Sequence, residues 1–188
     1  MRLLFIRHAE TETNVNRLTH KTGDTVGLTE KGKRQAEELI QKCGEENIET
    51  IFSSPEQRAV ETAQIIAEGL GLEYRILDGL TERNWGQWEG KPWSEIEKAL
   101  SPMSLEERYT FTPPGGESWE QMETRLQENL TKIIKCEAEN VAIITHEGAL
   151  RGLMPLFLRA PKESSFQYHF ENAEIIPFSY ENGIFTRD

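Results

Sequence analysis

Two arginines and two histidines stand in this sequence where a folded chain could gather them around one anion. Arg7 and His8 follow directly after the apolar run Leu3–Ile6, and Arg58 and His146 come soon after two other short apolar runs. Arginine donates paired hydrogen bonds to phosphate oxygens and stays charged at any working pH, and a neutral imidazole can act as a nucleophile. Together, these four side chains would suit the binding and transfer of a phosphoryl group.

Taken alone, each of these residues also has a plain structural explanation. The Arg7-His8 pair can be the solvated end of a strand, and a histidine such as His146 after a strand is commonly a hydrogen-bonded structural residue. Arg58 can pair with Glu61 on the same predicted helix. Only the convergence of the four side chains would therefore indicate an active site.

The elements that must position these side chains alternate between strands and helices. Strands are predicted at 3–6, 49–52, 74–77 and 141–145, helices at 29–46, 56–68, 118–137 and 149–158, a hairpin at 174–185, and irregular chain at 80–117. Thr29 suits a helix N-cap, Pro55 a first helical turn, and Asn182-Gly183 a hairpin turn. This alternation predicts a three-layer α/β/α sandwich around a mostly parallel mixed sheet.

Three of the predicted strands end in the residues that could do chemistry. In open α/β sheets ligands bind at the carboxyl ends of the strands. If the strands at 3–6, 49–52 and 141–145 are parallel neighbours, their ends converge. Arg7, His8, Arg58 and His146 would then surround one spot, and Asn14 could add a neutral donor.

Composition limits the other possibilities. The 188 residues, 37% of them hydrophobic, predict a single domain over residues 1–188. The net charge of −11 argues against a nucleic-acid binder, and no apolar run approaches the roughly 20 residues needed to cross a membrane. The run Leu3–Ile6 is also too short for a signal-peptide core, so a cytoplasmic protein is predicted. Cys43 and Cys136 lie far apart and are expected to be buried, reduced packing residues.

Two histidines with nearby acids could also suggest a metal site. The usual zinc spacings, with ligands three to five residues apart, are missing, and the two other histidines, His20 and His169, sit in no recognisable ligand pattern. The sequence therefore implies no metal and no cofactor.

The chain resembles the histidine phosphatase superfamily, also called phosphoglycerate mutase-like proteins. The resemblance covers nearly the whole chain, and its motifs occur in the expected order: Arg7-His8-Ala9-Glu10-Thr11 with Asn14, Leu28-Thr29 with Gly32 and Gln35-Ala36, Ser53-Ser54-Pro55 with Arg58-Ala59 and Thr62-Ala63, Glu82 with Gly86 and Trp88-Glu89-Gly90, Pro114-Gly115-Gly116-Glu117-Ser118, and Thr145-His146 with Gly148 and Arg151. Each motif is weak alone. In this order and at these spacings they are strong evidence, and they imply a phosphoglycerate mutase-like fold.

The resemblance implies a role for each of five residues. His8 would attack phosphorus and form a phosphohistidine, which requires a neutral ring with one unprotonated nitrogen. Arg7, Arg58 and His146 would bind the phosphoryl oxygens and stabilise the transition state. Glu82 would protonate the leaving oxygen and then take a proton from water; from composition alone it is one acid among several.

Residues 80–117 correspond to the family's cap-like segment over the active site. All four tryptophans lie between 85 and 119, so Trp85 is predicted to contact an apolar part of the leaving group, the alternative being that these rings are simply the small core of the cap.

This sequence departs from the family pattern at two places. Glu147 stands where members of the family commonly have glycine. If its carboxylate points into the pocket, it would repel phosphate or favour a substrate with a cationic group. If it points away, it would matter little. The loop Thr19–Gly27 fits the usual pattern poorly, and no ligand is assigned to it.

The resemblance favours the phosphatase branch and its broad-specificity and α-ribazole types. Glu82 through Gly90 looks like those enzymes, and the chain lacks the extra segments of the longer mutases. The expected activity is metal-independent hydrolysis of small phosphorylated metabolites. Two alternatives are mutase-type phosphoryl transfer and a non-catalytic phospho-ligand binder, and the physiological substrate and protein partners are left open.

Overall fold

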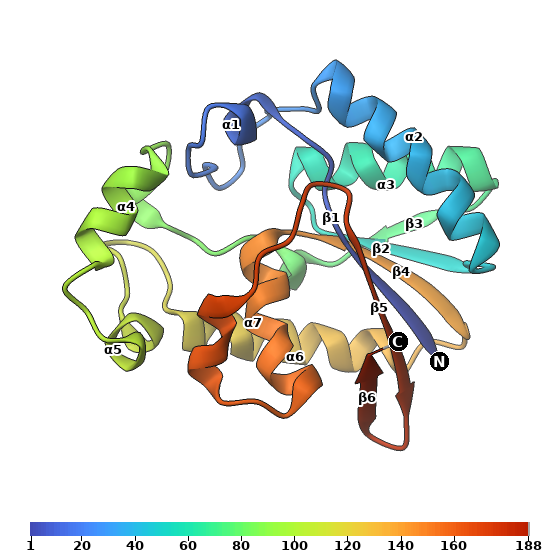
Figure 1. Cartoon of the computed structure of the whole chain (residues 1–188). Helices are drawn as coiled ribbons and strands as arrows, with labels where there is room; N and C mark the ends of the chain where they lie inside the picture. The colour runs from blue at the N-terminus through green and yellow to red at the C-terminus, as the bar shows by residue number, and fades with distance from the viewer. Residues whose placement is uncertain (188) are drawn as a thin grey trace.

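A six-stranded sheet forms the centre of the computed structural model, which describes residues 1–187 (Figure 1). Its strands are β1 (Arg2–Arg7), β2 (Thr50–Ser53), β3 (Tyr74–Ile76), β4 (Asn140–Thr145), β5 (Ile175–Glu181) and β6 (Ile184–Arg187). Their order across the sheet is β3-β2-β4-β1-β5-β6, with the first four parallel and β5 and β6 antiparallel. The predicted mixed, mostly parallel sheet is confirmed.

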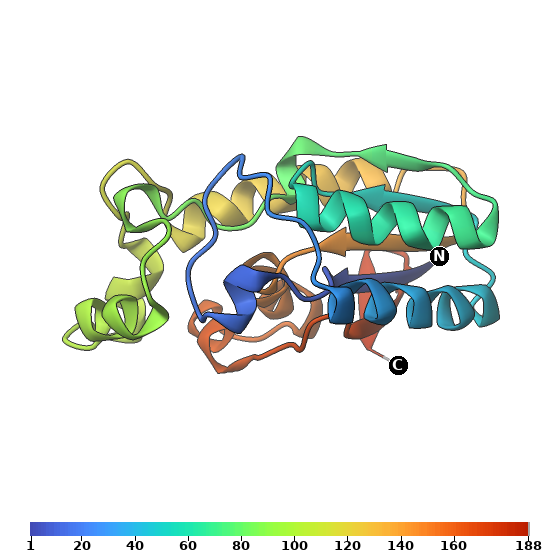
Figure 2. The same ribbon diagram turned by 90° about the horizontal axis from the view of Figure 1, so that it is seen from above.

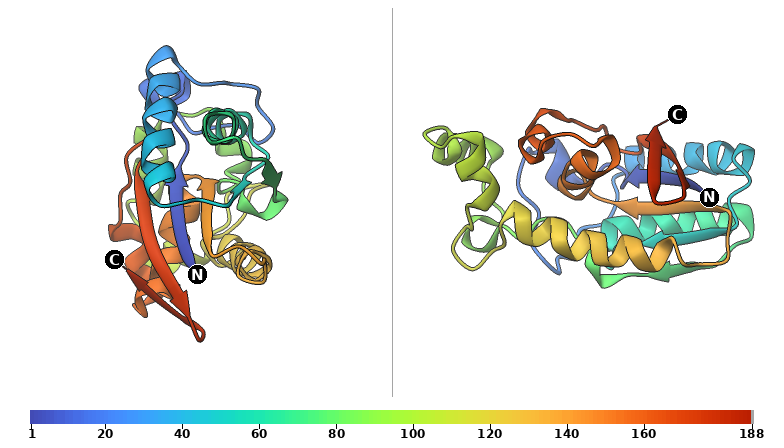
Figure 3. Two further views of the ribbon diagram at one scale, coloured as in Figure 1. Left: turned by 90° about the vertical axis from the view of Figure 1, so that its right-hand side faces the viewer. Right: turned by 90° about the horizontal axis from the view of Figure 1, so that it is seen from below.

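Helices cover both faces of this sheet. They are α2 (Glu30–Glu45) and α3 (Gln57–Leu70) on one face, and α6 (Trp119–Ile133) and α7 (Glu147–Leu158) on the other (Figure 1, Figure 3). The side chains of β1 alternate between the two layers, because Leu4 and Ile6 belong to the core with α2 and α3, while Leu3 and Phe5 belong to the core with α6 and α7. The predicted three-layer sandwich is therefore correct.

Local sequence signals explain where the helices begin and end. The Thr29 hydroxyl accepts a hydrogen bond from the Gly32 N–H at the start of α2, as an N-cap should. Ala36, Leu39 and Cys43 form the buried stripe of this helix, and Ile40 beside them is half-buried. These contacts fix α2 against the sheet beside the end of β1.

Two predicted helix boundaries and one cysteine need correction. The helix predicted over 118–137 ends at Ile133, and the helix predicted from Ala149 begins at Glu147. Cys43 is buried but Cys136 is half-buried, and neither forms a disulfide. The hairpin turn is confirmed, since Asn182 and Gly183 both have positive φ between β5 and β6.

The strands that were expected to position the site are parallel neighbours. Arg7 of β1 pairs with Thr145 of β4, and Ser53 of β2 pairs with Ile144 of the same strand. The His8 N–H continues the ladder by donating to the Thr145 carbonyl at 2.9 Å. The ends of β1, β2 and β4 therefore meet at one edge, as predicted.

The segment 80–117 is more ordered than expected. It contains the 3₁₀ turn η2 (Gly86–Trp88) and two helices, α4 (Trp93–Leu100) and α5 (Leu105–Thr110), and it follows the 3₁₀ turn η1 (Asp78–Leu80). Both helices are short, and an apolar pattern over six to eight residues is too brief to predict a helix. The one local signal was the capping box that Ser104 and Glu107 form at the start of α5. Figure 2 shows α4 and α5 beyond the edge where the parallel strands end.

Two further short elements complete the described chain. They are α1 (Glu12–Val15), just after β1, and the 3₁₀ helix η3 (Lys162–Gln167) after α7. Among residues 1–187, no helix has the length and hydropathy needed to cross a membrane.

Candidate active site

His8 lies at the centre of the polar cluster at the strand ends and is 2% exposed. Its Nδ1 is 2.8 Å from the Ala9 carbonyl oxygen, which can only accept, so Nδ1 carries the ring proton. Its Nε2 accepts a hydrogen bond from Nε of Arg58 at 3.3 Å and therefore bears the free electron pair. The neighbour that fixes this tautomer is a backbone carbonyl, which the sequence did not reveal.

The surroundings of His8 keep its ring neutral. Burial lowers the pKa of His8 well below its usual value, and the nearby charges of Arg58, His146 and Arg7 lower it further. A neutral ring with a free Nε2 is the form that a nucleophile needs.

Arg58 reaches His8 from the first turn of α3 and is fully buried. Its Nη2 donates to Glu56 at 2.8 Å, while its Nη1 lies 3.8 Å from Asp24 and has no hydrogen-bond partner within residues 1–187. A buried guanidinium is costly unless it is paired. Arg58 is therefore paired on one side and offers one N–H to a ligand.

Arg7 approaches from the end of β1. Its Nη1 donates to the Phe170 carbonyl at 2.5 Å and lies 2.8 Å from a carboxylate oxygen of Glu147. Its Nε is buried and has no partner among the described residues. Arg7 thus also keeps one donor unused.

His146 completes the set at the end of β4. Its ring centroid is 5.2 Å from that of His8, and its Nε2 lies 2.7 Å from both the Ser54 hydroxyl and Glu56. Burial lowers the pKa of His146, with Glu56 acting in the opposite direction and Arg58 adding to the decrease. Its buried Nδ1 has no partner within residues 1–187.

These observations describe an anion site. The buried side-chain nitrogens without a partner include Nε of Arg7, Nη1 of Arg58 and Nδ1 of His146, all close to His8. Buried polar groups in proteins are normally hydrogen-bonded, and exceptions need an explanation. A ligand with several acceptor oxygens, such as a phosphoryl group, would satisfy the two arginine nitrogens, and also Nδ1 of His146 when that nitrogen carries a proton.

Glu56 is part of this cluster and was missed by the sequence reasoning. It is 7% exposed and immediately precedes α3. Burial opposes its charged form, but His146 and Arg58 outweigh that effect and lower its pKa. Its position between Pro55 and Arg58, inside a recognised motif, was the available signal.

His20 is the second residue that was missed. Its ring lies edge-on to His8 at 5.6 Å, and its Nε2 is 3.3 Å from the Thr11 hydroxyl and 3.4 Å from Nδ2 of Asn14. Burial and the charges of Arg58 and His146 lower the pKa of His20 to about 2. The loop to which no ligand was assigned therefore brings a neutral imidazole next to His8.

The proposed acid Glu82 is held at the start of α7. Its carboxylate accepts hydrogen bonds from the N–H of Arg83 at 2.7 Å and from the N–H of Gly148 at 3.0 Å. Any side chain at Gly148 would collide with this carboxylate. Gly148 is thus needed so that Glu82 can reach the helix N-terminus beside His146.

The carboxylate of Glu147 contacts Arg7 and an exposed histidine. It lies 2.8 Å from Nη1 of Arg7 and 2.6 Å from Nδ1 of His169, whose other nitrogen is 3.3 Å from Glu171. The charge of Glu147 is therefore paired and sits at the side of the pocket where Arg7 enters.

The remaining two predicted site residues lie further from the reacting centre. The side-chain oxygen of Asn14 caps α1 by accepting from Thr11, and its Nδ2 faces His20. Trp85 is 5% exposed and packs at 5.2 Å against Trp93. The burial of Trp85 supports the packing alternative, whereas Trp93 presents its ring to solvent.

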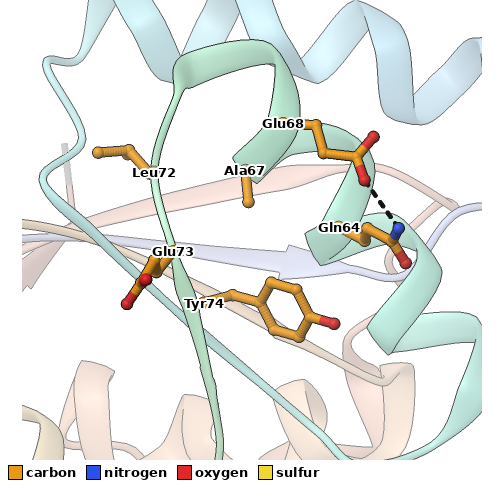
Figure 4. A pocket seen from close by; sticks show the side chains of 6 residues that line it. All are labelled: Gln64, Ala67, Glu68, Leu72, Glu73 and Tyr74. Carbon is orange, nitrogen blue, oxygen red and sulfur yellow. Dashed lines mark hydrogen bonds between the residues drawn. The ribbon is translucent and has the colours of Figure 1, made fainter.

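A groove along the C-terminal half of α3 carries none of this chemistry. Figure 4 shows it between α3 and β3, lined by Gln64, Ala67, Glu68, Leu72, Glu73 and Tyr74. Its one drawn interaction is the hydrogen bond from Gln64 to Glu68. Within the described part of the chain, no group of three or more histidine, cysteine or acidic residues is arranged to hold a metal ion.

Comparisons with known proteins agree with this geometry. A family model described as the histidine phosphatase superfamily (branch 1) matches residues 3–187. The chain is 30% identical over 183 residues to a putative phosphoserine phosphatase 2 of Hydrogenobacter thermophilus, covering 96% of this chain and 90% of the relative. It is 29% identical over 180 residues to a 2,3-bisphosphoglycerate-dependent phosphoglycerate mutase of Thermoplasma acidophilum, covering 96% and 88%.

Solved structures show the same fold. A mycobacterial glucosyl-3-phosphoglycerate phosphatase complexed with VO3 superposes with a TM-score of 0.87 at 25% identity, covering 100% of this chain and 97% of that chain. Some mycobacterial relatives that are 33% identical are longer, and the chain spans 49% of their length.

Proposed function

The chain belongs to the histidine phosphatase superfamily, and we propose that it hydrolyses small phosphomonoesters, without a metal ion, through a phosphohistidine intermediate. The observation that carries this proposal is the neutral His8 with its free Nε2, surrounded by buried nitrogens of Arg7, Arg58 and His146 that have no partner in residues 1–187. The phosphatase relatives support phosphoric monoester hydrolysis as the activity.

In the first step, Nε2 of His8 attacks the phosphorus atom of the substrate. The new N–P bond forms as the bond from phosphorus to the ester oxygen breaks, and protonated Glu82 gives its proton to the departing oxygen. The products of this step are the free alcohol and a phosphohistidine. Nδ1 of His8 keeps its proton in both steps and donates it in a hydrogen bond to the Ala9 carbonyl. The imidazole of the phosphohistidine therefore bears a positive charge, which the negative phosphoryl group offsets.

In the second step, water attacks the phosphohistidine. The Glu82 carboxylate accepts a proton from that water as the new P–O bond forms and the N–P bond breaks. Inorganic phosphate leaves, His8 returns to its neutral form, and Glu82 is again protonated. Arg7, Arg58 and His146 bind the phosphoryl oxygens in both steps, where charge develops in the transition state.

The substrate side of the pocket is proposed to involve three further residues. Asn14 supports His20, whose imidazole borders the phosphoryl site. Glu147 moderates the charge of Arg7 and adds a carboxylate near the leaving group. Residues 80–117 are proposed to be a cap on a single domain. The buried ring of Trp85 packs against Trp93 and holds this cap, so Trp85 is proposed to act on the leaving group indirectly, by positioning Trp93.

Two other functions and the cellular location complete the proposal. A mutase-type transfer has support from the phosphoglycerate mutase relative, and a non-catalytic binder would use the same nitrogens without attack by His8. The free thiols of Cys43 and Cys136 support a reducing, cytoplasmic location.

The experiment compares the wild type with His8→Ala in the presence of excess chelator. Phosphate release is measured from p-nitrophenyl phosphate and from a panel that includes phosphoserine and phosphoglycerates. We expect chelator-resistant turnover that disappears in the variant, and an acid-labile phosphoenzyme in the wild type alone. Isomerised phosphoglycerate without released phosphate would favour the mutase, and ligand binding without turnover in either protein would favour the binder.

A further inference from the structure

One carboxylate oxygen joins three parts of the pocket. Oε2 of Glu56 lies 2.7 Å from Nε2 of His146 and accepts hydrogen bonds from Nη2 of Arg58 at 2.8 Å and from the N–H of Glu82 at 3.1 Å. These partners come from the end of β4, from α3 and from the segment that carries the proposed acid. Glu56 thus touches the machinery on three sides without contacting His8.

The charge of Glu56 has a specific place in this arrangement. A buried carboxylate is costly unless charges and hydrogen bonds compensate it. Glu56 is 7% exposed, and His146 and Arg58 favour its ionised form strongly enough to lower its pKa. This charge pairs with the buried guanidinium of Arg58, and because the same oxygen lies 2.7 Å from Nε2 of His146, it also acts on the imidazole.

We propose that Glu56 is a positioning residue whose charge makes His146 take up a proton when a phosphoryl group enters the pocket. This inference rests on the proposed function, because it concerns the same phosphoryl site. When the substrate monoanion binds, the O–H bond of its P–OH group breaks as the Nδ1–H bond of His146 forms, which leaves the bound dianion. When the dianion itself binds, the proton is taken from a buffer acid in the solvent, where the conjugate base remains.

The geometry explains why that proton is needed. In a neutral His146 the ring proton on Nε2 is held by Glu56, and Nδ1 then presents an electron pair. An electron pair repels a phosphoryl oxygen, whereas an N–H at Nδ1 binds it. The doubly protonated ring would have Glu56 at one nitrogen and the phosphoryl group at the other, which satisfies the buried Nδ1 that has no partner within residues 1–187.

The other charged groups around His146 do not make this contribution. The titratable and charged groups that face it are Glu56 and Arg58 at the start of α3, Glu82 after η1, His8 after β1, and His20 in the loop before α2. Arg58 and burial disfavour the imidazolium, and Glu82 favours it to a smaller extent than Glu56. Glu56 is therefore the main group that makes protonation of His146 possible.

The first test compares pH profiles of wild type, Glu56→Gln and Glu68→Gln. Glutamine keeps the size and one acceptor oxygen of Glu56 but removes its charge, and Glu68 lies on the same helix away from the pocket and serves as the matched control. Removing an opposite charge in contact lowers a histidine pKa by about 1–3 units. We expect the alkaline limb of kcat, which reports groups in the enzyme–substrate complex, to move to lower pH by that amount in Glu56→Gln and to stay in place in Glu68→Gln.

The second test observes His146 directly and does not depend on turnover. The imidazole resonances of the wild type are titrated by NMR with saturating inorganic phosphate, using His146→Gln to assign the signal. We expect His146 to be protonated at pH 7 in the phosphate complex and neutral without phosphate. A ring that stays neutral in the wild-type complex, or identical pH profiles for wild type and Glu56→Gln, would overturn the proposal.

The two proposals can fail separately. Turnover that survives in His8→Ala would contradict the phosphohistidine mechanism and leave the His146 titration valid as a test of Glu56. If Glu56→Gln does not fold, the wild-type titration alone decides the question. A loss of activity in Glu56→Gln with an unshifted pH profile would mean that Glu56 only holds the structure, and would also overturn the proposal.

Discussion

Two parts of the proposed active site, called here the floor and the rim, are built differently. The floor consists of the buried residues Arg7, His8, Glu56, Arg58 and His146, which stand at the ends of β1 and β4 or the start of α3. The rim consists of Glu82, Glu147 and His169; Glu82 is half-buried, and the side chains of Glu147 and His169 are 22% and 68% exposed. Burial and fixed neighbours shift the pKa values of three floor residues, whereas rim side chains keep contact with water.

This difference suggests a division of work. The phosphoryl group is the same in every phosphomonoester, so a rigid, dry floor can be fitted to it once. The leaving group varies between substrates, and it meets side chains and loops that water also reaches. Changes in the floor should therefore affect all esters alike, and changes in the rim should depend on the leaving group.

The largest expected effect is at Arg58. Arg58→Lys keeps a positive charge but loses the planar fork that reaches both Glu56 and His8. We expect kcat/KM to fall by about 10²–10³, the cost of losing one transition-state donor, for every ester tested. Thermal melting of the variant checks that the fold is kept. A loss confined to some leaving groups would contradict the assignment of Arg58 to the floor.

Glu82 gives the matching test of the rim. Glu82→Gln keeps an acceptor for the N–H of Gly148 but removes the transferable proton. General acid catalysis contributes about 10²–10⁴, so we expect a loss of about 10² for alkyl phosphates and little loss for p-nitrophenyl phosphate, whose leaving group needs no proton. Values of kcat/KM over esters of graded leaving-group pKa measure this, because kcat/KM reports the first step and not the hydrolysis of the phosphohistidine that all esters share. Equal losses across the series would mean that Glu82 is not the acid.

The floor was largely predictable from the sequence. Apolar runs that end in Arg7-His8 and Thr145-His146 identify the strands, and the carboxyl ends of parallel strands share an edge. The position of Arg58 could be predicted because the connection between β2 and α3 is short, which places the first turn of α3 at the same edge of the sheet. Such local patterns suffice because each residue lies within a few positions of the strand that carries it.

The rest depends on contacts between distant segments. His20 reaches His8 because Thr11 bridges Leu28 and folds the intervening loop back over the pocket, a pairing with no local signal. From the sequence, Glu56 could not be distinguished from the many other acidic residues; its role follows from its contact with His146 in the structure. The helices α4 and α5 were missed for a different reason, since each is too short for a periodic pattern.

His20 allows a test of how strongly burial keeps the imidazoles near the floor neutral. Its folded pKa of about 2 lies below the unfolded value of 6.5, so the unfolded chain binds a proton as pH falls through that window and the folded protein does not. This group therefore stabilises nothing above pH 6.5 and destabilises the fold increasingly below it. His20→Gln removes the effect, so between pH 7 and pH 5 its free energy of unfolding should fall by about 2 kcal/mol less than that of the wild type.

Denaturant unfolding at the two pH values, in phosphate-free buffer, gives both free energies. Gln41→Asn is the control, because this exposed amide on α2 does not titrate and its replacement should leave the pH dependence unchanged. Parallel pH dependences for wild type and His20→Gln would show that the His20 ring is hydrated and does not belong to the dry part of the pocket.

The smallest effect is expected at Glu147, where the rim touches the floor through Arg7. Their side chains are 22% and 11% exposed, so solvent screens the pair at 2.8 Å and limits its worth to about 1 kcal/mol or less. Glu147→Gln frees the charge of Arg7 for the dianion, and inorganic phosphate should inhibit up to about fivefold more strongly, with the gain shrinking as salt is added. Weaker inhibition by phosphate would instead mean that Glu147 orients Arg7, and that the extra carboxylate belongs to the floor.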